Sequence, residues 1–356
     1  MFKLACSHFP SCSGCSYELS DCLPLFLKDF PFPLEIVSKD LTKWRMRSKL
    51  AIRGTNTAPL IGLFKKGSHT VLPIPLCLVH HPLINKTVRI VEELIKESGI
   101  IPYTEGRGTL RYCQIDVVEN QIMVAFVINS NVIDNQSQRF VDAAVQKGWK
   151  SLWINFNTRL DNVIFSDNWQ HISGDSYIWR SIAGTPIATT PASFSQANPA
   201  LFSTLVASLR DELRLGDRIV EFYAGNGSVS LPLLDKASHL VAIEQNPHTE
   251  ELFNLSLKDK TKARYITGDV KAGLPFIQDA DTIIVDPPRK GLDPVLLASL
   301  KEARGKDLFY ISCGWKGFLR DYKELIEAGW VLKRARAYLL FPGSDHIELL
   351  VSLRKE

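Results

Sequence analysis

The sequence has no run of apolar residues long enough to cross a membrane, which takes about 18 residues or more. Its first residues, MFKLACSHFP, lack the apolar core of a secretory signal peptide. Internal repeats and low-complexity stretches are absent too, which excludes solenoid and fibrous architectures. We therefore predict a globular, cytoplasmic protein with no membrane association.

The sequence also has little net charge, +4 over 356 residues, so charge alone does not identify a partner. The distribution of the charges along the chain is more informative. The segment KWRMRSKLAIR contains no acidic residue, and such a basic stripe suits phosphates. Its basic residues are Lys43, Arg45, Arg47, Lys49 and Arg53. Hydrophobic residues make up 45% of the chain, enough to bury the cores of two domains.

Residues 44 to about 181 alternate in the manner of strands, as in TLRYCQIDVV and QIMVAFVI. Two helical patterns interrupt them, PLINKTVRIVEELIKES at residues 82–98 and RFVDAAVQKG at 139–148. The threonine- and proline-rich segment that starts near residue 184 indicates a boundary. We predict an α+β RNA-binding domain with a cysteine-rich loop at 1–185, and a second domain at 186–356.

In the second domain, apolar strands such as DRIVEF, HLVAIE and TIIVDPP alternate with helical patterns, SVSLPLL among them. This rhythm predicts βαβ units in a parallel, doubly wound α/β sheet. The tail differs, because WVLKRARAYLL and HIELLVSL flank the short loop FPGSD and predict an antiparallel hairpin. A doubly wound sheet that ends in such a hairpin resembles the class I methyltransferase fold.

The loop EFYAGNGS, between a predicted strand and a helix, is a candidate cofactor site because Gly225 and Gly227 let backbone N–H groups approach a ligand. A dinucleotide fingerprint would need a third glycine where Ser230 stands, which disfavours a dehydrogenase. Glu244 ends the next strand and suits the two hydroxyls of a ribose, while Asp269 follows the strand after that, against an adenine. The alternative is that both acids are surface residues at strand ends.

Three cysteines stand close together at the N-terminus, Cys6, Cys12 and Cys15, with Cys77 apart from them. In a reducing compartment such clustering indicates metal binding rather than disulfides. Four thiolates can hold either a [4Fe–4S] cluster or a zinc ion, and the spacing leaves both open. The alternative ligands for zinc are His8, His80 and His81. Cys22 is as readily a free buried cysteine as a functional one.

Three further residues are candidates for chemistry. Asp286 opens DPPRKG at the carboxyl end of a strand, the edge at which open α/β sheets bind ligands, and Cys313 ends the following strand. A buried structural cysteine is the alternative reading of Cys313. Glu348 stands in an apolar strand, where burying a carboxylate is costly unless it has a partner or a function, and is a candidate base.

Taken together, these residues resemble the uracil-C5 RNA methyltransferase family, whose members make 5-methyluridine in ribosomal and transfer RNA. The motifs SFSQAN, EFYAGNGS, DPPRKG, SC and FPGSDHIE follow in that family's order. The resemblance implies S-adenosylmethionine as cofactor, Cys313 as nucleophile and Glu348 as base. The implied [4Fe–4S] ligands are Cys6, Cys12, Cys15 and Cys77, and the implied or candidate cofactor-binding residues are Gln196, Tyr223, Gly225, Ser228, Glu244, Asp269 and Asp286.

The resemblance also indicates a substrate. The ribosomal branch of the family carries the cluster. This sequence also lacks the family's usual N-terminal oligonucleotide-binding barrel, and in this it resembles the short branch that acts on 23S ribosomal RNA. One departure is that Gly314 and Trp315 follow Cys313, where the family has Asn and then Pro or Ala. We expect a monomer that methylates a single-stranded or flipped uridine. The alternatives are a methyltransferase for transfer RNA or for carbon 5 of cytidine, and a non-catalytic RNA-binding relative.

Overall fold

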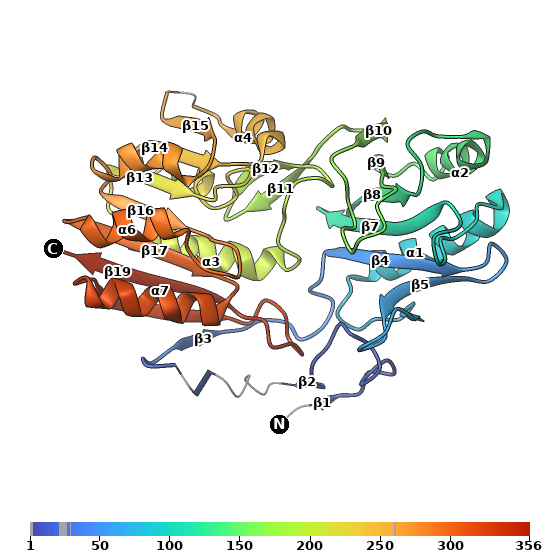
Figure 1. Ribbon diagram of the computed structural model, residues 1–356, viewed down its shortest axis with the longest axis horizontal. Coiled ribbons are helices and arrows are strands. Elements are labelled where there is room, and N and C mark those ends of the chain that lie inside the picture. Colours follow the sequence, from blue (N-terminus) through green and yellow to red (C-terminus); the bar gives the residue numbers. More distant parts are fainter. Residues whose placement is uncertain (1–2, 21–26, 29, 260) are drawn as a thin grey trace.

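The computed structural model describes residues 3–20, 27–28, 30–259 and 261–356. Two large sheets lie side by side, the seven-stranded one at the right of Figure 1 and the eight-stranded one at the left. Between them lies the antiparallel pair β11 (Ile178–Ile182) and β12 (Thr185–Thr189). No helix in the described part of the chain is long and apolar enough to cross a membrane.

The seven-stranded sheet has the order β10-β9-β8-β7-β4-β5-β6 and is antiparallel except where β8 and β9 pair in parallel. Its strands are β4 (Arg47–Gly54), β5 (Pro59–Phe64), β6 (Val71–Pro73), β7 (Leu110–Val118), β8 (Gln121–Ile128), β9 (Ser151–Phe156) and β10 (Trp169–Gly174). Helix α2 (Asn135–Val145) makes the crossover that the parallel pair requires.

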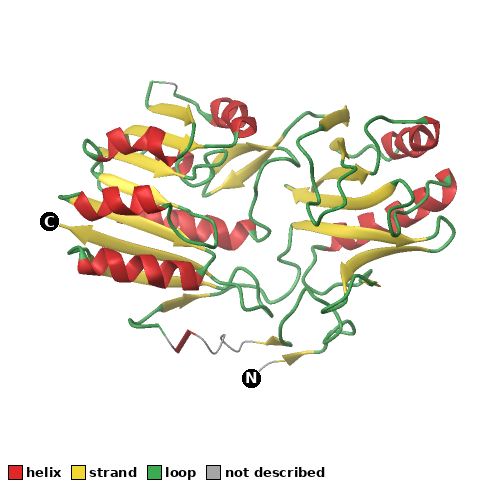
Figure 2. Cartoon of the chain, viewed as in Figure 1, coloured by secondary structure: helices red, strands yellow, loops and turns green. Residues whose placement is uncertain are grey.

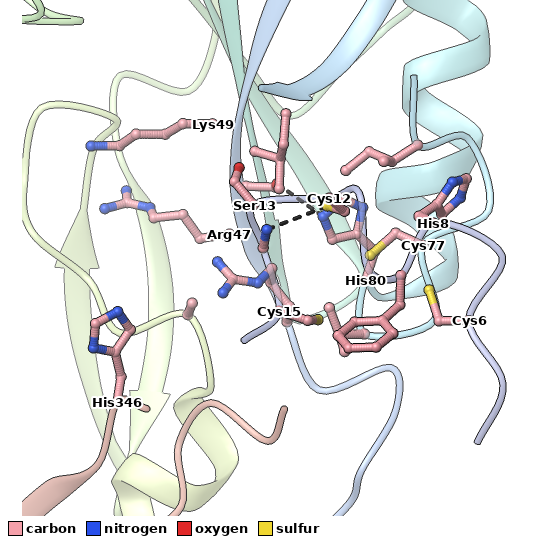
Figure 3. A pocket seen from close by; sticks show the side chains of 18 of the residues that line it. Cys6, His8, Cys12, Ser13, Cys15, Arg47, Lys49, Cys77, His80 and His346 are labelled. Atoms are coloured by element: carbon pink, nitrogen blue, oxygen red, sulfur yellow. Dashed lines mark hydrogen bonds between the residues drawn. The ribbon is translucent and has the colours of Figure 1, made fainter. Parts of the chain in front are cut away.

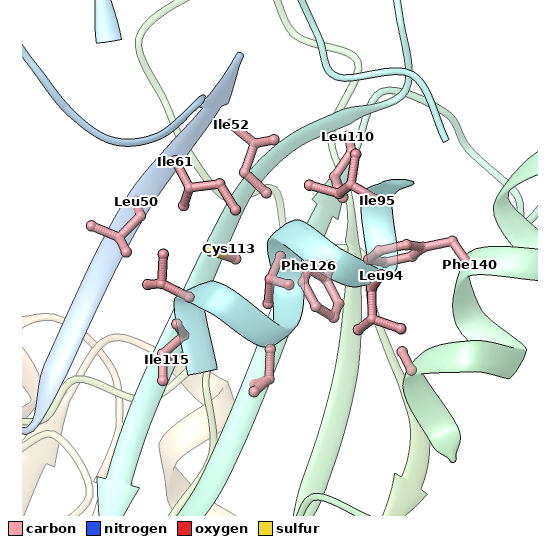
Figure 4. Packing of buried hydrophobic residues seen from close by; sticks show 14 of the residues in the cluster. Leu50, Ile52, Ile61, Leu94, Ile95, Leu110, Cys113, Ile115, Phe126 and Phe140 are labelled. Carbon is pink, nitrogen blue, oxygen red and sulfur yellow. The ribbon is translucent and has the colours of Figure 1, made fainter. Parts of the chain in front are cut away.

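Helix α1 (Pro82–Ser98) packs with α2 against one face of this sheet (Figure 4). Its predicted bounds are confirmed, since His81 caps its first turn and Gly99 ends it in the left-handed conformation, φ 73°. Helix α2 begins four residues before the predicted start, at Asn135 rather than residue 139, because Asp134 accepts a hydrogen bond from Ser137 N–H at 2.8 Å.

The eight-stranded sheet has the order β15-β14-β13-β16-β17-β19-β18-β3. Its strands are β3 (Glu35–Val37), β13 (Asp217–Phe222), β14 (Ala237–Glu244), β15 (Ala263–Thr267), β16 (Thr282–Val285), β17 (Lys306–Ser312), β18 (Val331–Tyr338) and β19 (Glu348–Lys355). In this order the strands β15, β14, β13, β16 and β17 are parallel to their neighbours, and β19 is antiparallel to both β17 and β18. The predicted doubly wound sheet with a C-terminal hairpin is confirmed.

Helices cover both faces of this sheet (Figure 2), and each face has its own apolar core. The helices are α3 (Pro199–Glu212), α4 (Glu250–Ser256), α5 (Leu274–Ile277), α6 (Pro294–Glu302) and α7 (Trp315–Glu327), with 3-10 turns at Leu231–Leu233, Pro247–Thr249 and Val270–Gly273. The helix start predicted at SVSLPLL is wrong. Only one 3-10 turn forms there, because β14 already begins at Ala237.

The N-terminal segment contributes to both halves. Besides the pair β1 (Lys3–Leu4) and β2 (Leu19–Ser20), it supplies β3, which adds a parallel strand to the edge of the eight-stranded sheet. Arg334 anchors it there with an ion pair to Glu35 at 2.8 Å. A piece of the chain from the range predicted for the first domain thus completes the sheet of the second, while the limits 1–185 and 186–356 stay a prediction.

Candidate active site

Cys313 and Glu348 meet at the junction of two neighbouring antiparallel strands. The register of β17 and β19 pairs Ser312 with Leu349, so Cys313, one residue later, comes opposite Glu348, one residue earlier. Cys313 is partly buried, and Glu348 is only 1% exposed. The thiol at the end of β17 and the carboxyl group at the start of β19 are therefore neighbours, close enough for Glu348 to raise the pKa of Cys313.

A second carboxyl group lies beside this pair. Asp286 follows β16, at the same edge of the sheet. Burial raises the pKa of Glu348 well above its usual value, and Asp286 adds to the rise while Arg289 opposes it. Burial also raises the pKa of Cys313 to about 11, again with contributions from both carboxyl groups and opposed by Arg289. These groups therefore titrate as neighbours, not independently.

Gln196 reaches the same place from the segment before α3. It is 8% exposed, and its side chain faces the Glu348 carboxyl group, where it opposes the rise in the pKa of Glu348. Neither carboxyl oxygen of Glu348 has a hydrogen-bond partner among the described residues. A buried carboxyl group without a firm partner is costly for stability, which favours a function for Glu348.

A cavity of about 260 Å³ opens at the carboxyl ends of β13 and β14. Among the candidate cofactor residues, Tyr223, Glu244 and Asp269 line it, and Lys290 and Asp293 complete its wall. The Tyr223 hydroxyl group accepts a hydrogen bond from Asp293 N–H at 3.2 Å, which orients the ring. Ser228 is not among the described residues that line this cavity.

The glycine loop and Glu244 hold one another in place. One carboxylate oxygen of Glu244 accepts from Gly225 N–H at 3.0 Å, and the other accepts from Asn246 N–H at 2.8 Å. Each oxygen keeps acceptor capacity for a ligand. Gly227, φ 81°, cannot be replaced easily, because a Cβ there would lie 2.6 Å from the Phe253 ring. The close packing of Gly227 against Phe253 and Leu231 therefore fixes this end of the loop.

Glu221 is a residue that we did not single out from the sequence. It is the second-last residue of β13 and only 1% exposed, and neither of its carboxyl oxygens has a geometric hydrogen-bond partner among the described residues. Burial raises its pKa to about 8, opposed by Ser230, while Asp286 and Glu244 add to the rise. The signal was present in the sequence, because a glutamate between Val220 and Phe222 is the same anomaly that marked Glu348.

The four predicted cluster ligands line one cavity of about 420 Å³ (Figure 3). Burial raises the pKa of Cys15 to about 11, and the other three cysteines contribute to the rise, so the thiols lie near one another. Within the described ranges, no three His, Cys, Asp or Glu side chains are arranged to hold a single metal ion. Cys22 lies outside the described residues.

The histidines near these cysteines have other roles. His80 is buried, with its ring nitrogens 3.0 Å from Ser48 Oγ and 3.2 Å from Asn85 Oδ1, and His81 caps α1. His8 lines the cavity. The two contacts of His80 fix its ring inside the protein.

The cysteine-rich loop bridges the two halves of the molecule. Ser13 N–H donates to Phe64 O at 3.2 Å, at the end of β5. On the other side, Ser16 N–H donates to Gly343 O at 2.7 Å, and the Tyr17 hydroxyl group donates to Ser344 O. Gly343 and Ser344 belong to the loop that leads to Glu348, so the cysteine loop supports the active-site strand.

The fold buries some residues of the basic stripe and leaves others exposed. Lys49 is exposed, but Arg47 is 8% exposed and forms an ion pair with Asp116. The expectation that Arg47 contacts RNA phosphates is therefore wrong, because its guanidinium group is already committed inside the protein. The guanidinium group of Arg45 lies over the rings of Trp44 and Phe341, at 5.0 and 5.6 Å, and Arg45 lines the cysteine cavity.

Known proteins resemble this chain in sequence and in fold. Residues 275–356 match the model of the tRNA (Uracil-5-)-methyltransferase family. A protein of Protochlamydia amoebophila, named an uncharacterized RNA methyltransferase, is 38% identical over 98% of this chain and 96% of its own length. A relative with the same description from Listeria innocua is 28% identical over 87% of this chain and 71% of its own.

Among solved structures, the tRNA (uracil-54, C5)-methyltransferase of Pyrococcus abyssi, in complex with S-adenosyl-L-homocysteine, superposes with a TM-score of 0.78. It is 24% identical, and the match covers 90% of this chain and 79% of that one. The fold and the edge of the sheet at which the candidate residues gather define a class I methyltransferase. Within that class, the chain belongs to the uracil-C5 RNA methyltransferase family.

Proposed function

We propose that the protein transfers a methyl group from S-adenosylmethionine to carbon 5 of a uridine in 23S ribosomal RNA, through a covalent bond between Cys313 and carbon 6. The observation that carries this proposal is the position of Cys313, just after β17, close to Glu348 at the start of β19 and to Asp286. The proposed reaction needs a nucleophile and a base on the same carbon–carbon bond of the substrate. A thiol and a carboxyl group on adjacent strands supply both.

The mechanism begins with the Cys313 thiolate. It adds to carbon 6 of the uracil, and the electrons of the carbon 5–carbon 6 double bond move to the carbonyl oxygen as an enolate. Bound S-adenosylmethionine supplies the methyl group that carbon 5 then takes. Glu348, as the carboxylate, removes the proton from carbon 5, the double bond forms again, and Cys313 leaves as thiolate.

The raised pKa values fit these roles. A base whose pKa lies well above 4.5 is stronger than an ordinary glutamate and holds the proton that it removes. The thiol, with its pKa near 11, must be helped to ionise. A positive charge in the acidic crevice would lower the pKa of Cys313 by offsetting the negative fields of Glu348 and Asp286.

The residues present fit S-adenosylmethionine. Glu244, held by two backbone N–H groups, would take the ribose hydroxyls, and Asp269 and Tyr223 would bound the adenosine. Gln196 and Asp286 lie toward Glu348, where the methyl donor must point, with Gly225 and Ser228 in the adjoining loop. The carboxyl groups of Glu244 and Asp286 near this crevice would complement a sulfonium cation.

The four cysteines would hold the proposed [4Fe–4S] cluster, which takes four thiolate ligands. Support for this comes from the cavity of about 420 Å³ that is lined by Cys6, Cys12, Cys15 and Cys77. The role of the cluster would be to fix the loop that bridges β5 and the turn before Glu348.

The test of the substrate is a comparison of modified nucleosides in RNA from cells with and without this protein. We expect one 5-methyluridine to disappear from 23S ribosomal RNA, with transfer RNA unchanged. Loss from transfer RNA, the substrate in the name of the matching family model, would move the proposal to that RNA. Loss of 5-methylcytidine would reject uridine, and no change in any RNA would favour a non-catalytic relative.

A further inference from the structure

The segment 190–198 connects the two sheets and carries Gln196. On one side it lies along the start of β4, where Met46 N–H donates to Ala197 O at 2.7 Å. On the other side, the Asn198 side chain donates to Leu340 O at 3.2 Å, in the chain leading away from β18. The segment that presents Gln196 is therefore fixed between the seven-stranded sheet and the active-site strands.

Arg47 makes the strongest of these attachments. Its Nη1 donates to Ser193 O at 2.7 Å, and its Nη2 donates to Thr190 O at 3.2 Å. Its Nε donates to Asp116, whose side chain is 1% exposed. One planar guanidinium group thus joins β4, β7 and two carbonyl groups of the segment, which a lysine in its place could not do.

Asp116 is itself held in place. Its second carboxylate oxygen accepts from Gln114 Nε2 at 2.8 Å, and Gln114 also donates to Pro191 O at 3.2 Å. Arg180, with its side chain 6% exposed, lies 3.9 Å from Asp116. Buried ion pairs are seldom more stabilising than apolar packing, so this network is better explained by the geometry that it imposes.

The hydrogen bonds of Arg47 can affect the active site because they hold the backbone just before Gln196. Ser193, whose carbonyl group Arg47 holds, lies three residues before Gln196, and Gln196 faces the buried carboxyl group of Glu348. We propose that Arg47, oriented by Asp116, is a positioning residue that places the Gln196 side chain against Glu348. The proposal rests on the proposed function, because Glu348 acts as a base only in that reaction.

A double-mutant cycle tests this proposal. Methyl transfer to unmodified 23S ribosomal RNA, transcribed in vitro, is measured at saturating substrate for the wild type, Arg47→Lys, Gln196→Ala and the double variant. If Arg47 acts through Gln196, Arg47→Lys lowers turnover about tenfold in the wild type but less than about twofold in the Gln196→Ala background. Equal factors in the two backgrounds would overturn the proposal, since a loss of general stability would act equally in both.

Two variants complete the design. Arg89→Lys makes the same substitution at an exposed position of α1, the helix that packs on one face of the seven-stranded sheet. This variant should leave turnover unchanged. If Arg47→Lys does not fold, Asp116→Asn takes its place in the cycle, because it keeps the arginine and removes only the group that orients it. The same coupling to Gln196 is expected.

Hydrogen exchange gives a readout that needs no activity. In Arg47→Lys, amide exchange in a peptide covering residues 190–198 should rise about tenfold over the wild type, with a peptide from α1 unchanged. Unchanged exchange in residues 190–198 would overturn the proposal even if the protein methylates no RNA. A wild type that is inactive on every RNA, with the exchange behaving as expected, would instead reject the proposed function.

Discussion

Gly314 lies directly against the backbone of Arg289, so closely that a Cβ on Gly314 would be 2.4 Å from Arg289 O and 2.6 Å from Arg289 Cα. The loop of DPPRKG is thus packed onto the residue after Cys313. An asparagine at position 314 would therefore clash with Arg289 unless the loop moved. The first turn of α7 shares the contact, since a Cβ on Gly317 would be 2.7 Å from the same carbonyl oxygen.

Gly314→Asn should therefore lower activity, although it restores the residue typical of the family. The added side chain must push the 286–290 loop away from Cys313, and such a displacement costs about tenfold or more in turnover. Turnover at saturating RNA and cofactor measures the effect. Lys323→Ala, a change at an exposed position of α7, is the control. Wild-type turnover in Gly314→Asn would show that the close contact is not needed.

The reactivity of Cys313 should depend on Glu348. Because the Glu348 carboxylate raises the pKa of Cys313, Glu348→Gln should lower that pKa from about 11. A fall of about one unit makes alkylation at pH 8 about tenfold faster. The rate of iodoacetamide labelling of the Cys313 peptide, followed by mass spectrometry from pH 7 to 10, checks this. Identical profiles in the two proteins would mean that the carboxyl group does not act on the thiol.

Glu221 should make the protein less stable as the pH rises. Its pKa is about 8 in the folded chain and near 4.5 when unfolded, so between these values the folded state holds a proton that the unfolded state has lost. Its contribution to the free energy of unfolding is complete below pH 4.5 and falls by about 1.4 kcal/mol per pH unit up to about pH 8.

Glu221→Gln removes this dependence, and its gain in stability over the wild type should grow from pH 5 to pH 8 in urea unfolding. Glu93→Gln, an exposed change on α1, controls for the loss of one acidic group. A gain in stability that is the same at pH 5 and pH 8 would show that Glu221 is not the group that holds the extra proton in the folded state.

Protein purified without oxygen should be brown and contain about four irons per chain, the number in one cubane held by four cysteines. Cys77→Ser should lose iron, whereas Cys113→Ser should keep it, because Cys113 is fully buried in the core of the seven-stranded sheet. Zinc in place of iron in such a preparation would show that the metal was chosen wrongly.

Local patterns in the sequence predicted much of the fold. The apolar period of PLINKTVRIVEELIKES predicted α1, and two apolar runs around FPGSD predicted the hairpin of β18 and β19. That Cys313 lies close to Glu348 became clear only from the register of β19 against β17. Sequence order could suggest that the two residues share a crevice, but not that they stand opposite one another.

Long-range contacts account for what the sequence did not predict. Arg47 reads as part of a basic surface stripe, and nothing near it indicates that Asp116, 69 residues away, would bury it. Likewise, β3 joins the far sheet through Arg334 and Arg336, about 300 residues later in the chain. Such contacts depend on how whole elements pack, which periodicity does not encode.

The most direct test of the account is to look for a covalent RNA–protein complex in Glu348→Gln. This variant can still add the Cys313 thiolate and take the methyl group onto carbon 5, but it cannot readily remove the carbon 5 proton. On denaturing gels we predict a methylated complex that accumulates in Glu348→Gln and is absent in the double variant with Cys313→Ala. Two results together would contradict the account, provided that the wild type methylates RNA normally. They are the absence of a Cys313-dependent complex in Glu348→Gln, and the absence of such a complex between the wild type and RNA that carries 5-fluorouridine at the target.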